Sequence, residues 1–324
     1  MPYDDNAVQK PNEIVFIGSW ASDEDFSIHP KGSQPKSTVV CPDPAPFDFL
    51  IPGHQYIFKT SKKKWQEIQL WSEVISYRIS KIAGINAPPC HVAVNENTGE
   101  VGVLMEFFFG YPLEAEPQRF IHASEYLARL LSDRKRGRPH ELRTNLRFCR
   151  ALKLPDPEIW WAQILAFDAL IGNTDRHPEN WGFLVNQCTD GTQSFRFAPA
   201  FDNGTSLGYE QSEDKLGALC ENASLSRYVS RGTHHCGWNA SEDGPLPHMS
   251  LCAKYISAYP RTSAEMRNVI RFERGQITAI CDECAEFDVG VRFTPARARF
   301  VAALVEARRA ALAEILGGYN GELD

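Results

Sequence analysis

Short apolar runs separated by proline and glycine make up most of the first hundred residues of the chain. Runs of this length, rich in β-branched and aromatic residues, predict β-strands at residues 13–18, 37–41, 55–60, 91–96 and 101–108. Between the third and fourth runs, apolar residues recur at spacings of three and four, which predicts an amphipathic helix over residues 64–83. The pattern therefore predicts a small β-sheet accompanied by one helix.

After Gly110 the spacing of apolar residues becomes mainly helical. An amphipathic helix is predicted over residues 123–134. The helix predicted over residues 157–171 is apolar on almost every side, so we expect it to be buried. Two strand-like runs follow, at residues 181–185 and 195–201.

The rest of the chain holds one poorly patterned stretch and one clear helix. Residues 210–247 are rich in glycine, serine and histidine and show no clear apolar pattern. A last helix is predicted to begin after Thr294 as its N-cap and to continue to Leu316. A small sheet followed by a larger helical part predicts an α+β fold in two lobes, residues 1–110 and 111–324.

Composition and charge exclude several classes of protein. The chain has 324 residues, 43% of them hydrophobic and 23% charged, as in globular proteins. Its formal net charge of −7 argues against direct binding to nucleic acid or to an anionic membrane. The N-terminal residues lack a signal-peptide pattern, and nine scattered cysteines suit free thiols in a reducing compartment. We therefore expect a cytoplasmic protein.

A dense polar cluster interrupts the apolar pattern between the buried helix and the next strand. Asp175, Arg176, His177, Glu179 and Asn180 fall within six positions, flanked by apolar residues on both sides. A polar surface turn is the simplest explanation of such a cluster. The residues elsewhere in the chain that complement it favour a functional site instead.

A second acid, Asp202, follows two strand-like runs later. Two carboxylates and the Asn180 carboxamide are oxygen donors of the kind that magnesium prefers, together with substrate phosphates. Phosphoryl transfer also needs a positive charge on the phosphates and a base near the attacking hydroxyl group. Lys59, in an apolar strand, suits the first role, and Glu73 in the following helix would hold its ammonium group. Glu67 is the alternative partner for Lys59.

Residues 31–39 form a turn-like segment that leads into a strand. Gly32, the backbone amides and Lys36 could cover phosphates there. One glycine alone is weak evidence for a phosphate-binding loop.

The segments LIGNTDRHPENWGFL and PAFDNGTSLG closely resemble kinases of the HipA/CtkA group, which are bacterial Ser/Thr kinases with a protein-kinase fold. Four more segments are similar to the family's phosphate loop, nucleotide-lysine strand, glutamate helix and hinge. They read GSQPKS, YIFK, SEVISYRISKIAGI and VLMEFF. The resemblance implies a protein-kinase-like two-lobe fold with a small, mostly β N-lobe and a larger, mainly helical C-lobe.

Carried over residue by residue, the resemblance implies that Asp175 is the catalytic base and that Asn180 and Asp202 bind magnesium. Lys59, paired with Glu73, would bind the ATP phosphates. The other nucleotide-binding residues that it implies are Gly32, Ser33, Gln34 and Lys36 in the loop, Glu106, Phe107 and Phe108 in the hinge, and His177 beside the base.

The chain departs from the family pattern in four respects. It has no G-x-G-x-x-G loop, and DNG stands where most kinases have D-F-G. Residues 41–54 form an insertion before the lysine strand, and the N-terminal subdomain of longer members is missing from the pattern. These departures concern loop geometry and regulation and leave the metal-binding residues in place.

The resemblance implies an ATP- and magnesium-dependent Ser/Thr protein kinase, toxin-like, with a protein substrate and a cognate antitoxin as partners. It also implies autophosphorylation in the phosphate loop, at Ser33 or Ser37, with Ser27 as a more distant site. The alternatives are a lipid or small-molecule kinase and a nucleotide-binding pseudokinase. The basic face that a phosphoinositide kinase would favour is absent from the pattern, and a pseudokinase has no need of the complete catalytic set.

Three further features leave alternatives open. We expect His177 to hold its loop by hydrogen bonds rather than to transfer protons. Arg176 would pair with a phosphorylated residue or be solvated. Cys281 and Cys284 have half the spacing of a zinc site that the motif at residues 234–236 could complete, although one such pair is a weak signal.

Overall fold

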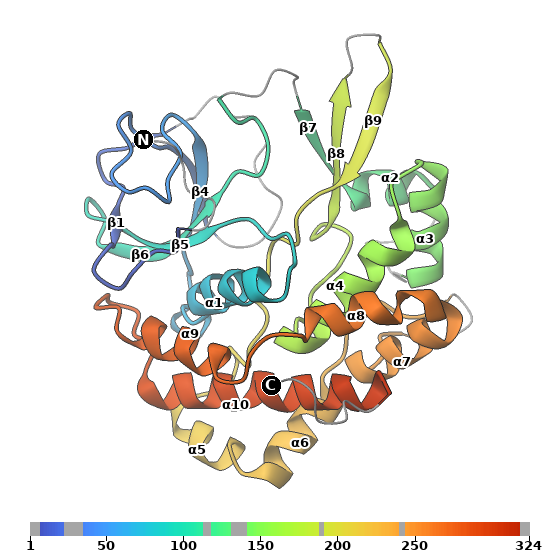
Figure 1. Cartoon of the computed structure of the whole chain (residues 1–324). Helices are drawn as coiled ribbons and strands as arrows, with labels where there is room; N and C mark the ends of the chain where they lie inside the picture. Colours follow the sequence, from blue (N-terminus) through green and yellow to red (C-terminus); the bar gives the residue numbers. More distant parts are fainter. Residues whose placement is uncertain are drawn as a thin grey trace.

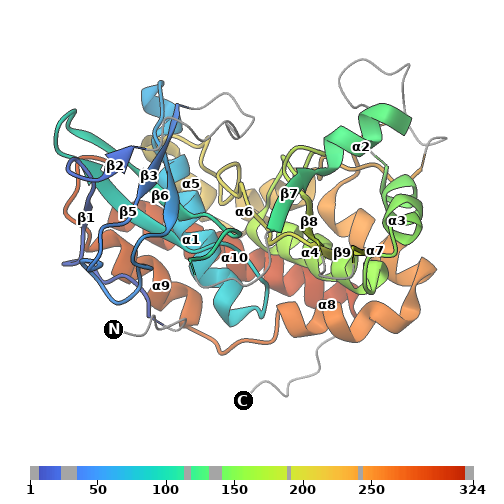
Figure 2. The same cartoon turned by 90° about the horizontal axis from the view of Figure 1, so that it is seen from above.

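The computed structural model describes residues 7–22, 35–112, 118–130, 141–187, 191–239 and 244–317. One β-sheet and helix α1 (Gln69–Ile82) form one side of the molecule, and a second sheet with several helices forms the other (Figure 1). Helix α10 (Pro295–Ile315) extends beneath both sides (Figure 2).

The first sheet has six strands in the order β1-β5-β6-β4-β3-β2. The strands are β1 (Val15–Phe16), β2 (Ala21–Ser22), β3 (Lys36–Val40), β4 (Gln55–Lys59), β5 (Cys90–Asn95) and β6 (Glu100–Glu106). All neighbours are antiparallel except β1 and β5. The five predicted strands are therefore confirmed, with the first reduced to two residues and the others shifted by one or two positions.

Helix α1 begins later than the apolar pattern predicts. A short 3-10 turn, η1 (Lys64–Gln66), takes the first residues of the predicted range, and the α-helix starts at Gln69. Nearly every side chain of α1 is buried, because the sheet covers one face and the C-terminal segment covers another. The Trp71 indole donates to the Val291 carbonyl oxygen at 2.9 Å, which ties α1 to that segment.

The second part contains three antiparallel strands in the order β7-β8-β9 and nine labelled α-helices among the described residues. The strands are β7 (Gln118–His122), β8 (Gly182–Gln187) and β9 (Gln193–Phe197). The helices are α2 (Ala123–Leu130), α3 (Leu142–Ala151), α4 (Pro157–Ile171), α5 (Leu216–Leu219), α6 (Asn222–Arg231), α7 (His248–Ala258), α8 (Ser263–Val269), α9 (Gln276–Ala285) and α10 (Pro295–Ile315). Figure 1 shows α10 running below both α1 and α4.

Some of these elements differ from the sequence-based expectation. Helix α4 has the predicted bounds, and its apolar surface is buried by α7, α8 and α10. Helices α5 and α6 lie within residues 210–247, the stretch in which the sequence shows no clear apolar pattern. The first has only four residues, and the second buries only Leu225 and Val229, so neither produces a strong apolar pattern. Strand β7 has no counterpart among the predicted strands.

The main hydrophobic core runs through both parts of the molecule. It joins Trp71 of α1 to Trp161 of α4 and Phe300 of α10 in one contiguous cluster of buried side chains. Among the described residues, no helix combines the length and the apolar character needed to cross a membrane.

The last helix begins as the sequence predicts, with a side-chain cap. The Thr294 hydroxyl oxygen accepts a hydrogen bond from the Arg297 amide at 3.1 Å and donates one to Glu213 at 2.6 Å. We expect Thr294→Ala to lower the free energy of unfolding by about 0.5–2 kcal/mol, measured by urea denaturation. Thr294→Ser keeps the hydroxyl and should retain most of that stability; equal losses in both variants would contradict a capping role.

Candidate active site

Lys59 lies at the end of β4 between two carboxylates from distant parts of the chain. Its ammonium nitrogen is 3.1 Å from Glu73 Oε1 and 3.1 Å from Asp202 Oδ1. The partner in α1 is therefore Glu73, and Glu67 lines the opposite side of β4. Glu73 also accepts a hydrogen bond from the backbone amide of Asn203 at 2.9 Å. One glutamate thus connects the β4 lysine with the loop that carries Asp202.

The opposite charges of Lys59 and its two carboxylate partners stabilise one another. Burial alone would lower the pKa of Lys59, but the Asp202 and Glu73 carboxylates raise it above its usual range. Burial alone would raise the pKa of Asp202, but the ammonium groups of Lys59 and Lys36 hold it below its usual range. Both Lys59 and Asp202 are therefore ionised at neutral pH, the states in which a lysine can bind a phosphate and an aspartate a metal ion.

Arg176 is buried at the centre of the site, with 1% of its surface exposed. Its guanidinium forms a two-point ion pair with Asp168 of α4, at 2.8 and 3.1 Å. The same group donates to the carbonyl oxygens of Asn180 at 3.0 Å and Phe201 at 2.6 Å. Neither role expected for Arg176, a phosphoresidue contact or a solvated charge, is correct, because the side chain is enclosed and its donors are bound to Asp168, Asn203 and two carbonyl oxygens.

Asp168 receives further donors that fix the ion pair in place. Its carboxylate accepts a hydrogen bond from Asn173 at 3.1 Å and contacts His234 Nε2 at 3.1 Å. Burial would raise the pKa of Asp168, but the Arg176 charge and the hydrogen bond from His234 lower it below its usual range. The ion pair consequently stabilises the fold above about pH 4, the ordinary value for aspartate, and that contribution is lost only as the pH falls further.

The loop after α4 presents Asp175 toward the solvent. The Asp175 side chain is 42% exposed, and its backbone amide donates to the Asn173 side chain at 3.0 Å. Asn180 Nδ2 donates to the Asp175 carbonyl oxygen at 2.8 Å, which closes the loop. His177 Nδ1 accepts from the Glu179 amide at 3.1 Å, and its Nε2 lies 3.7 Å from Asp175 Oδ2. These are the contacts of a histidine that holds the loop.

Asn180 and Asp202 have donor sets that fit a magnesium ion. The Asn180 amide nitrogen is used inside the loop, so the oxygen of its side chain is the atom left to face a ligand. Asp202 has a positive φ of 58°, an uncommon backbone conformation for a residue other than glycine that often occurs at functional sites. Because Arg176 binds the carbonyl groups of both Asn180 and Phe201, the two loops that carry these oxygens are held side by side.

A cleft with one apolar and one charged end adjoins these residues. Its charged end consists of Lys36, Lys59 and Asp202, and Lys36 is the direct cross-strand neighbour of Lys59. Its apolar end is lined by Ile57, Met105, Phe107, Phe108, Phe109, Phe120, His122 and Phe201. Such a cleft offers an apolar surface to a flat ring and positive charge to phosphates.

The hinge residues differ in the backbone groups that they leave available. The Glu106 amide donates to the Pro89 carbonyl oxygen, and the Phe107 amide donates to that of Gln55. His54 Nε2 lies 2.6 Å from the Phe107 carbonyl oxygen. Within the described residues, Phe108 forms no such backbone hydrogen bond, so it is the hinge residue best placed to bind a ring edge. Gly32, Ser33 and Gln34 of the predicted phosphate loop lie outside the described residues.

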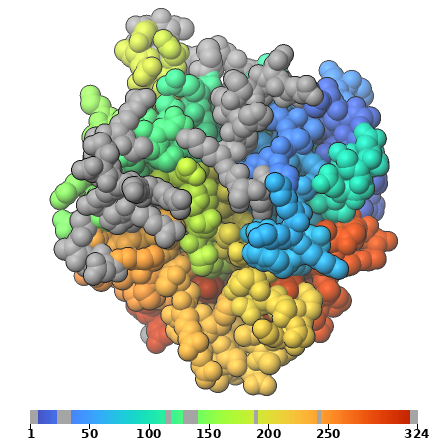
Figure 3. Space-filling model, turned by 180° about the vertical axis from the view of Figure 1, so that it is seen from behind, coloured from blue at the N-terminus to red at the C-terminus, as the bar shows by residue number. Residues whose placement is uncertain are grey.

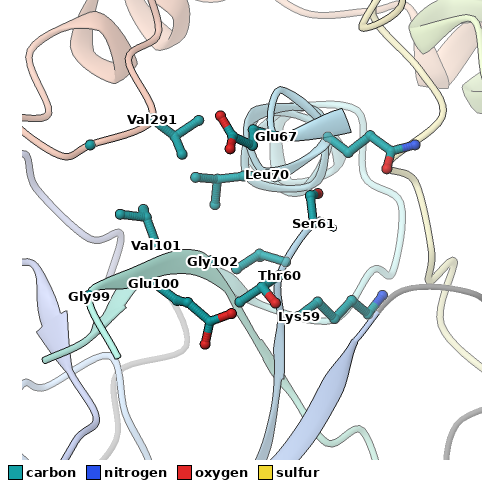
Figure 4. A pocket seen from close by; sticks show the side chains of 13 residues that line it. Lys59, Thr60, Ser61, Glu67, Leu70, Gly99, Glu100, Val101, Gly102 and Val291 are labelled. Atoms are coloured by element: carbon teal, nitrogen blue, oxygen red, sulfur yellow. The ribbon is translucent and has the colours of Figure 1, made fainter. Parts of the chain in front are cut away.

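A second cavity lies behind the lysine, between β4, β6 and the start of α1. Figure 4 shows that the Lys59 ammonium points away from Glu100 and Val101, which line this cavity. This cavity therefore adjoins the aliphatic part of Lys59 but not its charge, and the candidate active site is the front cleft.

The cysteine pair has a structural position. Cys281 and Cys284 are buried in α9, whereas His234 of the motif at residues 234–236 contacts Asp168. In the part of the chain that the structure describes, no three histidine, cysteine or acidic side chains gather as metal ligands would.

Sequence reasoning identified Lys59, Glu73 and Asp202 but missed the residues that organise them. Asp168 and Asn203 were not singled out, and His234 was considered only as part of a zinc motif, although all three bind the buried Arg176 or its partner. One signal was present in the sequence: Asp168 is the only charged residue between positions 159 and 171, in a helix that is otherwise almost entirely apolar. A charge in such a helix requires a buried partner.

The family described as HipA-like C-terminal domain matches residues 28–241, which include every element of this site. The chain belongs to the HipA-like family. No curated protein sequence gives a significant match to this HipA-like chain.

Two solved structures resemble the HipA-like chain over most of its length. One is the proinflammatory kinase CtkA of Helicobacter pylori, with a TM-score of 0.67 and 14% identity over 94% of this chain and 96% of that chain. The other is HipA of the Shewanella oneidensis MR-1 toxin–antitoxin system, in complex with HipB and operator DNA. It has a TM-score of 0.51 and 16% identity over 90% of this chain and 66% of that chain. The α+β, protein-kinase-like fold predicted from the sequence is thereby confirmed.

The buried ion pair between Arg176 and Asp168 is expected to contribute to the free energy of unfolding. Arg176→Met leaves the Asp168 carboxylate buried without its main partner, which should cost about 3–5 kcal/mol of unfolding free energy. The matched control is Arg292→Met, which removes an exposed arginine that is 2.6 Å from Asp288 and should cost less than about 1 kcal/mol. Urea denaturation of the two variants tests this, and similar losses would contradict the central role of Arg176.

Proposed function

We propose that this HipA-like protein is an ATP- and magnesium-dependent Ser/Thr protein kinase. The observation that carries the proposal is the position of Lys59, which is held at 3.1 Å from both Glu73 and Asp202 at the charged end of an otherwise apolar cleft. Kinases use this combination to hold phosphates beside a metal ion.

In this proposal Asp202 and Asn180 hold magnesium through their side-chain oxygens. A bound magnesium ion neutralises the charge that develops on the transferred phosphoryl group. Lys59 binds the phosphates as a fixed cation, because its two carboxylate partners keep it protonated and oriented. Lys36, directly across from Lys59 on β3, adds a second positive charge at the same end of the cleft. The aromatic end takes the adenine ring.

Asp175 is the proposed base. Its exposed carboxylate lies in the loop that Asn180 closes, so it can meet an acceptor hydroxyl group that approaches from solvent. It orients that hydroxyl group and accepts its proton as the new oxygen–phosphorus bond forms and the bond from the γ-phosphorus to ADP breaks, so that ADP is the leaving group. His177, which lies 3.7 Å from the same carboxylate, restrains its direction.

The partners follow from the relatives only as proposals. We infer a protein substrate, and a cognate antitoxin because the related Shewanella HipA is seen with HipB and operator DNA. Ser33 and Ser37 are the proposed autophosphorylation sites, as the resemblance to the family implies, and a phosphate of nearly two negative charges on either would repel ATP.

Incubation with γ-labelled ATP and magnesium, alone and with bacterial lysate, tests the function. Label on protein bands supports a protein kinase, whereas label only in the lipid or small-molecule fraction would favour a different kinase. Nucleotide binding without transfer to any acceptor would indicate a pseudokinase and contradict the proposal.

The metal assignment is tested by Asp202→Asn, which keeps the shape of the side chain and removes its charge. With magnesium present, the variant should bind ATP at least tenfold more weakly and lose phosphoryl transfer, because one metal ligand has lost its charge. With magnesium chelated, it should bind ATP at least as well as the native chain, since the native carboxylate then only repels phosphates. Calorimetric titrations in both conditions measure this; equal metal dependence in both proteins would refute the assignment.

The base is tested by Asp175→Asn. A base acts mainly in the transition state, so we expect kcat to fall on the order of 100-fold or more while the Kd for ATP changes only a few-fold. Lys59→Met provides the contrast, because it should weaken ATP binding as well as lower the rate. Thermal unfolding of Asp175→Asn should match the native chain, as the side chain is partly exposed. A variant that unfolds, or one with native activity, would contradict this role.

A further inference from the structure

The turn between β4 and α1 is a local concentration of positive charge on an acidic protein. Lys62, Lys63 and Lys64 are exposed, whereas the whole chain has a formal net charge of −7. Within the described part of the chain, none of the three ammonium groups forms an ion pair with a carboxylate. Lys63 instead lies over the ring of Trp65, with its nitrogen 5.9 Å from the ring centre. These charges are therefore available to an external partner.

Trp65 adds a large apolar surface to the same turn. Its side chain is 54% exposed. Single exposed aromatic residues are common on protein surfaces and do not by themselves indicate a binding site. This one is not isolated, because its ring stacks on Tyr209 with centroids 6.3 Å apart and planes at 23°. Trp65 precedes α1, whereas Tyr209 follows the Asp202 loop in the helical part. The pair thus joins the two sides of the molecule beside the candidate active site.

The Tyr209 side of this pair lies close to the proposed base. The Thr174 amide donates to the Thr205 carbonyl oxygen at 3.3 Å, so the segment leading to Tyr209 runs along the loop of Asp175. The Tyr209 pKa is raised by burial and then by the negative charges of Glu210 and Asp175. In Figure 3 the light-blue surface around residue 65 borders the yellow surface around residue 210.

We propose that Lys62, Lys63, Lys64, Trp65 and Tyr209 form the docking surface for the protein substrate, and that the substrate segment is acidic. Glutamate or aspartate residues of that segment bind the three lysines, and a large apolar or aromatic side chain packs on Trp65. The phosphorylated serine or threonine lies toward Asp175. This inference rests on the proposed kinase function and names the chemistry of its acceptor.

The charges around the surface limit where the substrate's acids can lie. Asp175 and Glu210 are both negative and lie on the Tyr209 side, so an acidic residue of the substrate there would be repelled. The favourable side is the lysine turn, several residues from the acceptor along an extended chain. The substrate is therefore expected to be acidic on one side of the acceptor only.

Binding of fluorescent peptides in the absence of ATP tests the surface independently of catalysis. The probe is a twelve-residue peptide with one serine, a phenylalanine, and four glutamates on one side; its twin has four lysines in their place. The variant Lys62→Glu/Lys63→Glu/Lys64→Glu should bind the acidic peptide about tenfold more weakly or worse, and the loss should shrink at high salt. The matched control, Lys10→Glu/Lys153→Glu/Lys254→Glu, makes the same net charge change on other elements and should bind within about twofold of the native chain.

Trp65→Ala tests the apolar contact separately. It should weaken binding of the acidic peptide several-fold at any salt concentration, and replacing the peptide phenylalanine by alanine should cause no further loss in this variant. In kinase assays the lysine variant should show a raised KM for the peptide with kcat and the KM for ATP unchanged.

Three results would overturn the docking surface: equal binding of both peptides, equal effects of the two triple variants, or tighter lysine-dependent binding of a single-stranded RNA of matched charge. Failure of the kinase function would look different. Peptide binding that depends on the lysines, without phosphate transfer, would support the docking surface and contradict the kinase function. Phosphate transfer that is unaffected by the lysine substitutions would support the kinase function and contradict the docking surface.

Discussion

The ion pair between Arg176 and Asp168 is the constraint on which the candidate site depends. A buried guanidinium must satisfy its donors inside the protein, and Arg176 does so with Asp168, Asn203 and the carbonyl oxygens of Asn180 and Phe201. Those contacts bring together a helix and two loops that are separated along the chain. The side chains proposed to bind magnesium lie on the two loops, so their placement follows from the needs of one buried charge.

A second set of contacts connects the Asp202 loop to α1 and to strand β4 of the first sheet. The Asn203 amide binds Glu73, Glu73 binds Lys59, and Lys59 binds Asp202, which precedes Asn203. The closed circuit joins β4, α1 and the Asp202 loop, and it includes charges from both parts of the molecule. The asparagine that follows Asp202 takes part through its side chain as well as its amide, because it accepts from Arg176 and donates to the Ala200 carbonyl oxygen. The residue after Asp202 therefore uses its amide and both polar atoms of its side chain inside the protein.

The sequence was informative where chemistry depends on residue type and local pattern. The strands, the buried helix α4, the N-cap Thr294 and the pairing of Lys59 with Glu73 followed from apolar spacing and from charges in apolar surroundings. Strand β7 and the short α5 and α6 could not be predicted in this way, because partners distant along the chain stabilise them. The role of Arg176 was missed for a related reason: its partners Asp168 and Asn203 are 8 positions before it and 27 after it, and only the fold makes them neighbours.

A crystal structure of the protein with magnesium and a non-hydrolysable ATP analogue tests the central claim most directly. The claim is that the circuit organised by Arg176 is a metal–nucleotide site. We expect the metal on the side-chain oxygens of Asn180 and Asp202, phosphates against the Lys59 ammonium, adenine among the aromatic residues of the cleft, and the Arg176–Asp168 pair intact. A nucleotide bound elsewhere, or a metal ion that contacts neither Asn180 nor Asp202, would contradict the account.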